Sequence, residues 1–216
     1  MASVEDEIAA VIFDLDGVLA DSRIAFARCV NAALVAAGVP ERPAADLHRY
    51  LGPPLHATFV ELTGDASLAQ GCLDAYRARY REHAATETTV PDWMADVIAT
   101  LAGRMPLAVA TSKPLALSAP LLDALGLLGH FDVVEGPSLE ARAEPKAETI
   151  RRALAGLPAG LRAVMVGDTR FDVIGAHEHG LACIGVLWGI GSEEELREAG
   201  ADLLVATPQD LLTALH

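Results

Sequence analysis

The feature that most constrains the fold is a set of short, predominantly apolar runs. The first covers residues 8–13 and stops at Asp14. A run this short and this rich in β-branched residues is typical of a strand buried on both faces, as in a parallel sheet. Further runs of the same kind follow at Leu107–Thr111, Phe131–Val134, Ala163–Val166, Cys183–Leu187 and Leu203–Ala206.

Amphipathic stretches with recognisable helix starts lie between these runs from residue 91 onward. Pro91 and the segment 112–114 each open such a stretch, and Pro145 and Pro208 stand where a first helical turn tolerates proline. Alternating strands and helices form βα units with right-handed crossovers. The sequence therefore predicts an α/β fold with a Rossmann-like parallel sheet.

Residues 22–90 interrupt this alternation. They hold no apolar strand run, but they show helical patterns over 24–37, 55–62 and 66–83, separated by segments with glycine and proline. The length of 216 residues fits one domain that carries a smaller insert. We predict a sheet core formed by residues 1–21 and 91–216, and a helical cap formed by residues 22–90.

The composition limits the partners. Thirty acidic residues against 16 basic ones give a formal net charge of −14, which repels nucleic acid and anionic lipid over the general surface. No apolar run is long enough to span a membrane, and the first residues are acidic where a signal peptide would be basic. We therefore expect a cytoplasmic protein with no nucleic-acid or membrane partner. We expect Cys29, Cys72 and Cys183, which form no CxxC pair, to be free thiols.

Polar residues follow several of the predicted strands. In open parallel sheets, ligands bind outside the carboxyl ends of the strands, so this position favours a functional role. Hydroxyl groups and free backbone N–H groups, where a strand ends and a helix starts, also favour the binding of an anion. The chain's lysines, Lys113 and Lys146, both fall in this set. Its members are Asp14, Asp16, Thr111, Ser112, Lys113, Lys146, Asp168 and Asp172.

In order, these residues resemble the four motifs of the haloacid dehalogenase-like hydrolases. The motifs are Phe13-Asp-Leu-Asp-Gly-Val-Leu19, Thr111, Lys146 and Gly167-Asp-Thr-Arg-Phe-Asp172. The match covers the whole chain, and residues 22–90 look like the small helical cap of one branch. Within that branch the sequence is similar to phosphoglycolate phosphatase-like and 5′-nucleotidase-like members. Gly52-Pro-Pro-Leu55 and Gly185-Val-Leu-Trp-Gly189 support this placement.

The resemblance implies a phosphatase that acts on a small phosphomonoester, phosphoglycolate-like or a nucleoside 5′-monophosphate, through an aspartyl-phosphate. Asp14 is then the nucleophile, and Asp16 protonates the leaving oxygen and later activates water. Mg²⁺, which prefers oxygen ligands, is then held by Asp14, the backbone carbonyl of Asp16 and Asp168, with Asp172 orienting the ligands.

The resemblance also implies a phosphate site. Thr111 and the backbone N–H of Ser112 bind phosphoryl oxygens, and Lys146 neutralises charge on the phosphate and the nucleophile. Lys113 is expected to bind substrate beside them. Arg49 flanks the loop at residues 52–54, which by resemblance faces the active site, so we expect it to contact the leaving group.

Other reactions on the same fold stay open or are disfavoured by single residues. Asp16 argues against a dehalogenase, and the absence of lysine from residues 22–90 argues against a phosphonate hydrolase. A phosphomutase of the β-phosphoglucomutase type is also expected to carry a cap lysine, but it remains an alternative. A phospho-acceptor regulatory protein is a further alternative, although receiver domains have no helical insert. The substrate, and whether the chain is a monomer or a dimer, are left open.

Overall fold

The computed structural model describes residues 8–141 and 143–215, so the acidic residues 1–7 lie outside the described residues. The strands are β1 (Ala10–Phe13), β2 (Leu107–Ala110), β3 (Val133–Glu135), β4 (Ala163–Gly167), β5 (Ala182–Val186) and β6 (Leu203–Val205). The α-helices are α1 (Arg23–Ala36), α2 (Ala44–Leu47), α3 (Leu55–Thr63), α4 (Ala69–Glu87), α5 (Asp92–Ala102), α6 (Leu115–Ala124), α7 (Lys146–Gly156), α8 (Arg170–His177), α9 (Glu193–Ala199) and α10 (Pro208–Ala214). Two 3-10 helices are η1 (His48–Tyr50) and η2 (Leu128–His130).

The strands form one parallel sheet in the order β3-β2-β1-β4-β5-β6. All the predicted strand runs are present, and the α/β fold with a Rossmann-like sheet is confirmed. The chain leaves β1 toward β2 and β3 on one side, then returns to β4 on the other. The direction of winding therefore reverses between β1 and β4, and open sheets of this kind bind ligands at such a point.

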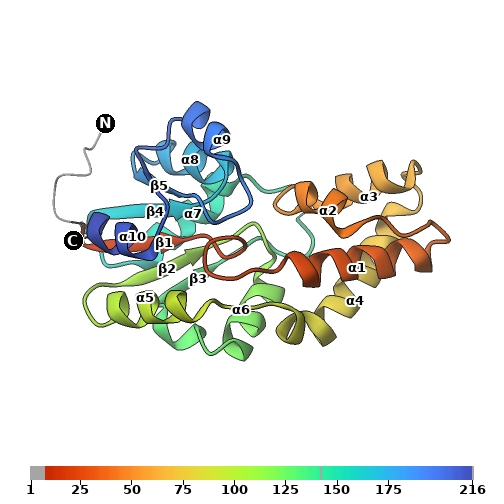
Figure 1. Ribbon diagram of the computed structural model, residues 1–216, viewed down its shortest axis with the longest axis horizontal. Helices are drawn as coiled ribbons and strands as arrows, with labels where there is room; N and C mark the ends of the chain where they lie inside the picture. The colour runs from red at the N-terminus through yellow and green to blue at the C-terminus, as the bar shows by residue number, and fades with distance from the viewer. Residues whose placement is uncertain (1–7, 142, 216) are drawn as a thin grey trace.

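Helices cover both faces of the sheet, which explains why the strand runs are apolar throughout. Along β1, Val11 and Phe13 belong to the buried cluster that includes α5, α6 and α10. The alternate residues Ala10 and Ile12 belong to the cluster that includes α7, α8 and α9. Side chains alternate along a strand, so a strand covered on both sides needs apolar residues at every position. Figure 1 shows α5 and α6 on one side of the strands and α8 and α9 on the other.

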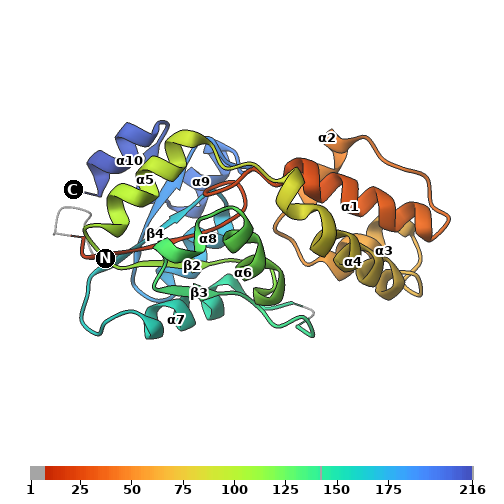
Figure 2. The same ribbon diagram turned by 90° about the horizontal axis from the view of Figure 1, so that it is seen from below.

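Helices α1 to α4 stand beyond one end of the sheet, apart from the helices that cover it (Figures 1 and 2). Tyr76 of α4 lies at their centre. Its ring meets Phe26 of α1 edge-on at 6.0 Å and Phe59 of α3 edge-on at 6.2 Å, and it stacks on Tyr80 at 5.5 Å. The sequence patterns predicted the three longer helices but not α2 or η1, which are too short to show a helical period.

The chain crosses between the sheet and these helices twice, and the two crossings are bonded to each other. Asp21 donates its backbone N–H to the carbonyl of Thr89 at 2.8 Å, and Thr89 donates to Asp21 at 3.1 Å. This antiparallel pair lies next to the domain boundaries expected at residues 21/22 and 90/91. The boundaries themselves stay predictions.

Two expectations from composition can be compared with the described residues. Cys29, Cys72 and Cys183 are buried and free. Within residues 8–141 and 143–215, no helix combines the length and the apolar character needed to cross a bilayer.

Candidate active site

The carboxyl ends of the strands bring the predicted acidic residues together. Asp14 follows β1, and its backbone N–H donates to the carbonyl of Val166 at 3.0 Å, so the pairing of β1 with β4 extends to Asp14. Asp168 directly follows β4, and Asp172 lies in the first turn of α8. One carboxylate oxygen from each of these aspartates lies within 4.8 Å of the others, and all three residues are buried. The sheet therefore holds this cluster, hereafter the acidic triad, in fixed positions.

Lys146 joins two members of the acidic triad. Its Nζ lies 2.7 Å from Oδ1 of Asp14 and 2.8 Å from Oδ1 of Asp172. Lys146 is the first residue of α7 and is itself buried. Burial alone would lower the pKa of the ammonium, but the carboxylates of Asp14 and Asp172 outweigh it and raise the pKa. Lys146 is therefore a fixed positive charge beside Asp14.

Asp172 is fixed by its second oxygen. Oδ2 accepts hydrogen bonds from the backbone N–H of Asp168 at 3.2 Å and from that of Thr169 at 3.1 Å, and from Oγ1 of Thr169 at 2.9 Å. These bonds form a capping box at the start of α8. Oδ2 of Asp172 thus caps the N-terminus of α8, and Oδ1 contacts Lys146.

Asp168 has one oxygen bonded and one oxygen free. Oδ2 accepts a hydrogen bond from the backbone N–H of Ile190 at 2.6 Å. Oδ1 is fully buried and has no hydrogen-bond partner among the described residues. Burial, with the carboxylates of Asp172 and Asp14 nearby, raises the pKa of Asp168 well above its usual value. An unpartnered buried carboxylate oxygen is costly unless a proton or a cation balances it.

The charge balance in this cluster fits a divalent cation. Burial raises the pKa of Asp14 to about 6, against the opposing effect of the Lys146 ammonium. One ammonium does not compensate three buried carboxylates. Mg²⁺ takes oxygen ligands and is bound by few carboxylates at a time. The donor set therefore fits Mg²⁺, the cation that the resemblance implies.

Two glycines allow the chain to approach Asp168 closely. Gly17 has a φ of +87°, in the left-handed region, and a Cβ placed on it would collide with the carboxylate of Asp168. A Cβ on Gly189 would collide with the same side chain. The glycine after the Asp14–Asp16 pair is therefore required by both its backbone conformation and its neighbour.

Asp16 is bound by residues outside the acidic triad. Its Oδ1 lies 2.5 Å from Nζ of Lys113 and accepts a hydrogen bond from Oγ of Ser22. The Lys113 ammonium also lies over the ring of Tyr80, 5.0 Å from its centre. The structure thus places Lys113, expected to bind substrate, as a partner of Asp16. The Asp16 side chain is not part of the triad, which leaves only its backbone carbonyl as the expected metal ligand.

The predicted phosphate-binding segment lies before a helix, not in its first turn. Helix α6 begins at Leu115 with Pro114 as its N-cap, three residues later than the segment 112–114 suggested. Thr111 is buried at the end of β2, and its Oγ1 accepts the backbone N–H of Lys113 at 3.2 Å. Ser112 lines the open cavity described next.

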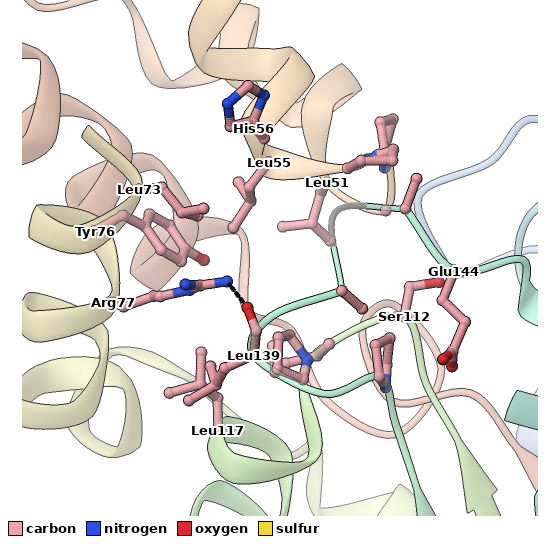
Figure 3. A pocket seen from close by; sticks show the side chains of 18 of the residues that line it. Leu51, Leu55, His56, Leu73, Tyr76, Arg77, Ser112, Leu117, Leu139 and Glu144 are labelled. Atoms are coloured by element: carbon pink, nitrogen blue, oxygen red, sulfur yellow. Dashed lines mark hydrogen bonds between the residues drawn. The ribbon is translucent and has the colours of Figure 1, made fainter. Parts of the chain in front are cut away.

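A cavity of about 570 Å³ lies between this edge of the sheet and the helical insert. Asp16, Lys113, Lys146 and Ser112 line it on the sheet side. Residues 50–56, from the end of η1 to the start of α3, and helix α4 line it from the insert, and residues 137–141 form a third side (Figure 3). The described residues thus form an open cavity large enough for a small organic molecule beside the acidic triad.

The structure corrects the expected position of Arg49. Arg49 is not among the described residues that line the cavity. Its guanidinium lies 3.2 Å from the carboxylate of Glu61 and donates to the hydroxyl of Tyr50 at 2.6 Å, and the side chain is 71% exposed. These two partners hold Arg49 on the outer surface. The neighbouring His56, by contrast, does line the cavity (Figure 3).

Arg77 of α4, which the sequence analysis does not single out, lines the cavity instead. Its Nη2 donates to the carbonyl of Leu139, and Figure 3 shows the side chain reaching from α4 toward that loop. The sequence feature that could have indicated this position is the spacing of Arg77 from apolar residues of the same helix. Arg77 comes four residues after the buried Leu73 and one after the buried Tyr76, which places it at the edge of the buried helix face.

Three comparisons agree with this geometry. Residues 11–186 match the family model described as haloacid dehalogenase-like hydrolase. The chain is 38% identical to a 5′-nucleotidase of Pseudomonas aeruginosa, over 87% of this chain and 86% of that protein. It is 30% identical to a phosphoglycolate phosphatase of Caulobacter vibrioides, over 91% and 86%. The solved structure of protein tyrosine kinase A from Mycobacterium tuberculosis superposes with a TM-score of 0.83 at 33% identity, over 97% of this chain and 99% of that one.

Proposed function

The chain belongs to the haloacid dehalogenase-like hydrolases, and from that premise we propose that it is a Mg²⁺-dependent phosphatase of small phosphomonoesters. The observation that carries the proposal is the placement of Lys146, whose ammonium touches both Asp14 and Asp172 at the wall of the cavity. A carboxylate held against a fixed cation is suited to attack a phosphate dianion, because the cation offsets the repulsion between the two anions.

In the first step, an oxygen of Asp14 attacks phosphorus, and the bond from phosphorus to the ester oxygen breaks. Asp16 donates a proton to the departing oxygen, so the alcohol leaves neutral. The product on the protein is an aspartyl-phosphate at Asp14. Lys146 stabilises the negative charge that is distributed over the phosphoryl oxygens in this step.

In the second step, Asp16 takes a proton from a water molecule, and that water attacks the aspartyl-phosphate. Inorganic phosphate leaves, and Asp14 becomes a free carboxylate again. Lys113 and Ser22 both contact Oδ1 of Asp16 and fix the orientation of its side chain. Oδ2 is then the oxygen that carries the proton.

The metal would be held by Asp14, the backbone carbonyl of Asp16 and Asp168, with Asp172 beside them. When bound, Mg²⁺ supplies positive charge to the phosphoryl oxygens and satisfies the unpartnered Oδ1 of Asp168. Ser112, on the cavity wall, and Thr111, at the end of β2, would receive the remaining phosphoryl oxygens. Arg49 has no part in this proposal, because it lies outside the cavity.

Two readings compete with hydrolysis. A phosphomutase needs the second step to exclude water, and a regulatory protein needs a long-lived aspartyl-phosphate. We favour hydrolysis because the two relatives reported above carry hydrolase names, and because the cavity is sized for a small molecule.

The experiment is phosphate release from a panel of phosphomonoesters, with Mg²⁺ and with EDTA. The panel holds phosphoglycolate, nucleoside 5′-monophosphates, sugar phosphates and p-nitrophenyl phosphate. We expect release that requires Mg²⁺ and is lost in Asp14→Asn, while the circular dichroism of that variant is unchanged. Release by Asp14→Asn above a few per cent of wild type would show that Asp14 is not the nucleophile.

A further inference from the structure

The cavity has a second charged position, on the side formed by the helical insert. Arg77 projects from α4, and its Nη2 donates to the backbone carbonyl of Leu139 (Figure 3). Leu139 lies in the loop between β3 and α7, opposite the insert. Arg77 therefore lies on the cavity wall formed by the insert, whereas Asp16 and Lys146 come from the sheet.

The charge on Arg77 differs from the others in this cavity. Lys113 is paired with Asp16, and Lys146 is paired with Asp14 and Asp172. Among the described residues, the partner of Arg77 is a neutral carbonyl. A guanidinium has five N–H donors, so one bond to Leu139 leaves donors for an anion.

Among the described residues, no carboxylate of the wall forms an ion pair with Arg77. Glu144 is paired with Arg152 at 2.7 Å. Glu140 is solvent-exposed. The wall around Arg77 is largely apolar and includes Leu55, Leu73, Tyr76, Leu117 and Leu139 (Figure 3). An ion pair formed in such surroundings is stronger than one in water.

We propose that Arg77 binds an anionic group on the leaving group of the substrate, so that the enzyme selects phosphomonoesters whose leaving group carries a carboxylate. This inference rests on the proposed function. The phosphate is bound at the edge of the sheet, and the carboxylate is bound by the insert. The guanidinium fork matches a carboxylate with two parallel hydrogen bonds, which fixes the orientation of the leaving group.

Two matched substrate pairs test the proposal. Phosphoglycolate and 2-hydroxyethyl phosphate differ in one carboxylate, as do 4-carboxybenzyl phosphate and benzyl phosphate, whose larger leaving groups also report how far Arg77 reaches. In at least one pair, Arg77→Gln should lower kcat/KM for the carboxylate-bearing substrate by about 10- to 100-fold, mainly through KM. The neutral substrate should change by less than about 3-fold. Arg77→Lys keeps the charge, so its kcat/KM for the carboxylate-bearing substrate should lie between those of the wild type and Arg77→Gln.

Arg81→Gln is the matched control, because it removes an exposed arginine from the same helix and should behave as wild type. Equal losses for both members of each pair would mean that Arg77 only ties α4 to Leu139, and would overturn the inference. Wild-type kcat/KM values without preference for the carboxylate would also overturn it, while leaving the phosphatase function intact. Phosphate release from no substrate of the panel would overturn the proposed function itself. Arg77→Lys keeps the test valid if Arg77→Gln does not fold.

Discussion

The ammonium of Lys113 lies 2.5 Å from Oδ1 of Asp16, and the two residues come from different strand ends of the sheet. Tyr80 of the helical insert lies over the same ammonium. The group proposed to move protons is therefore fixed by a residue that the insert also contacts. The orientation of the Asp16 side chain is therefore linked, through Lys113, to the packing of the helical insert against the sheet.

Lys113→Met should lower kcat for alkyl phosphates by about 10-fold or more, because Asp16 loses the charged partner that orients it. The loss should be smaller for p-nitrophenyl phosphate, whose leaving group needs little protonation. Ser22→Ala is the control, since it removes the neutral partner of the same oxygen and should cost less. Steady-state kinetics on both substrates measure this, and equal losses would show that Lys113 does not act through Asp16.

Lys146→Met should destabilise the metal-free protein by about 3–5 kcal/mol, because Asp14 and Asp172 are then buried without a partner charge. Urea unfolding in EDTA measures this difference. The double variant Lys146→Met with Asp172→Asn removes one of those charges and should recover part of the loss. If the double variant is no more stable than the single one, the lost contact is packing and not charge.

Mg²⁺ should raise the melting temperature of the wild-type protein by about 3–6 °C at ten times its Kd. Asp168→Asn should lose most of this rise, because the amide is a poorer ligand. Without metal the variant should be at least as stable as wild type, since the amide oxygen still accepts the Ile190 N–H and a buried charge is gone. Asp96→Asn makes the same charge change on the exposed face of α5 and should keep the full response. An unchanged response in Asp168→Asn would place the metal elsewhere.

Stability without metal should depend on pH through Asp14. Burial raises the pKa of this carboxyl to about 6, above the value of 3.8 for an exposed aspartate. The folded state therefore binds the proton more tightly, and the resulting stability is present below pH 4 and is lost as pH rises through 6. Asp14→Asn does not lose stability in this way. Between pH 4 and pH 7, its free energy of unfolding should therefore rise relative to that of the wild type by on the order of 2–3 kcal/mol. Denaturant unfolding in EDTA measures the difference, and a difference independent of pH would contradict the assignment.

The sheet could be predicted from the sequence because its causes are local. The strands are covered on both faces, so their sequences are predominantly apolar, and the parallel order brings every carboxyl end to one edge of the sheet. Asp14 and Asp168 could be placed for that reason. Their roles as nucleophile and metal ligand remain predictions.

The insert could be predicted only in part, because its arginines are placed by contacts distant in sequence. Arg49 is held on the outside by Glu61, twelve residues away, and Arg77 is drawn inward by a carbonyl 62 residues away. Neither partner is apparent from a helical pattern. Lys113 was likewise predicted to lie near the phosphate site. Its contact with Asp16 was not predicted, because the two residues are 97 positions apart in the sequence.

The bonded pair of Asp21 and Thr89 has a consequence for how such a chain can diversify. Because the insert leaves and re-enters the sheet at one point, its two ends are as close as those of a surface hairpin. Segments joined in this way tolerate changes of length and replacement without displacing their host. Residues 22–88, between them, are therefore an exchangeable module: a different insert grafted at this pair changes what enters the cavity, while the carboxylates on the sheet keep their places.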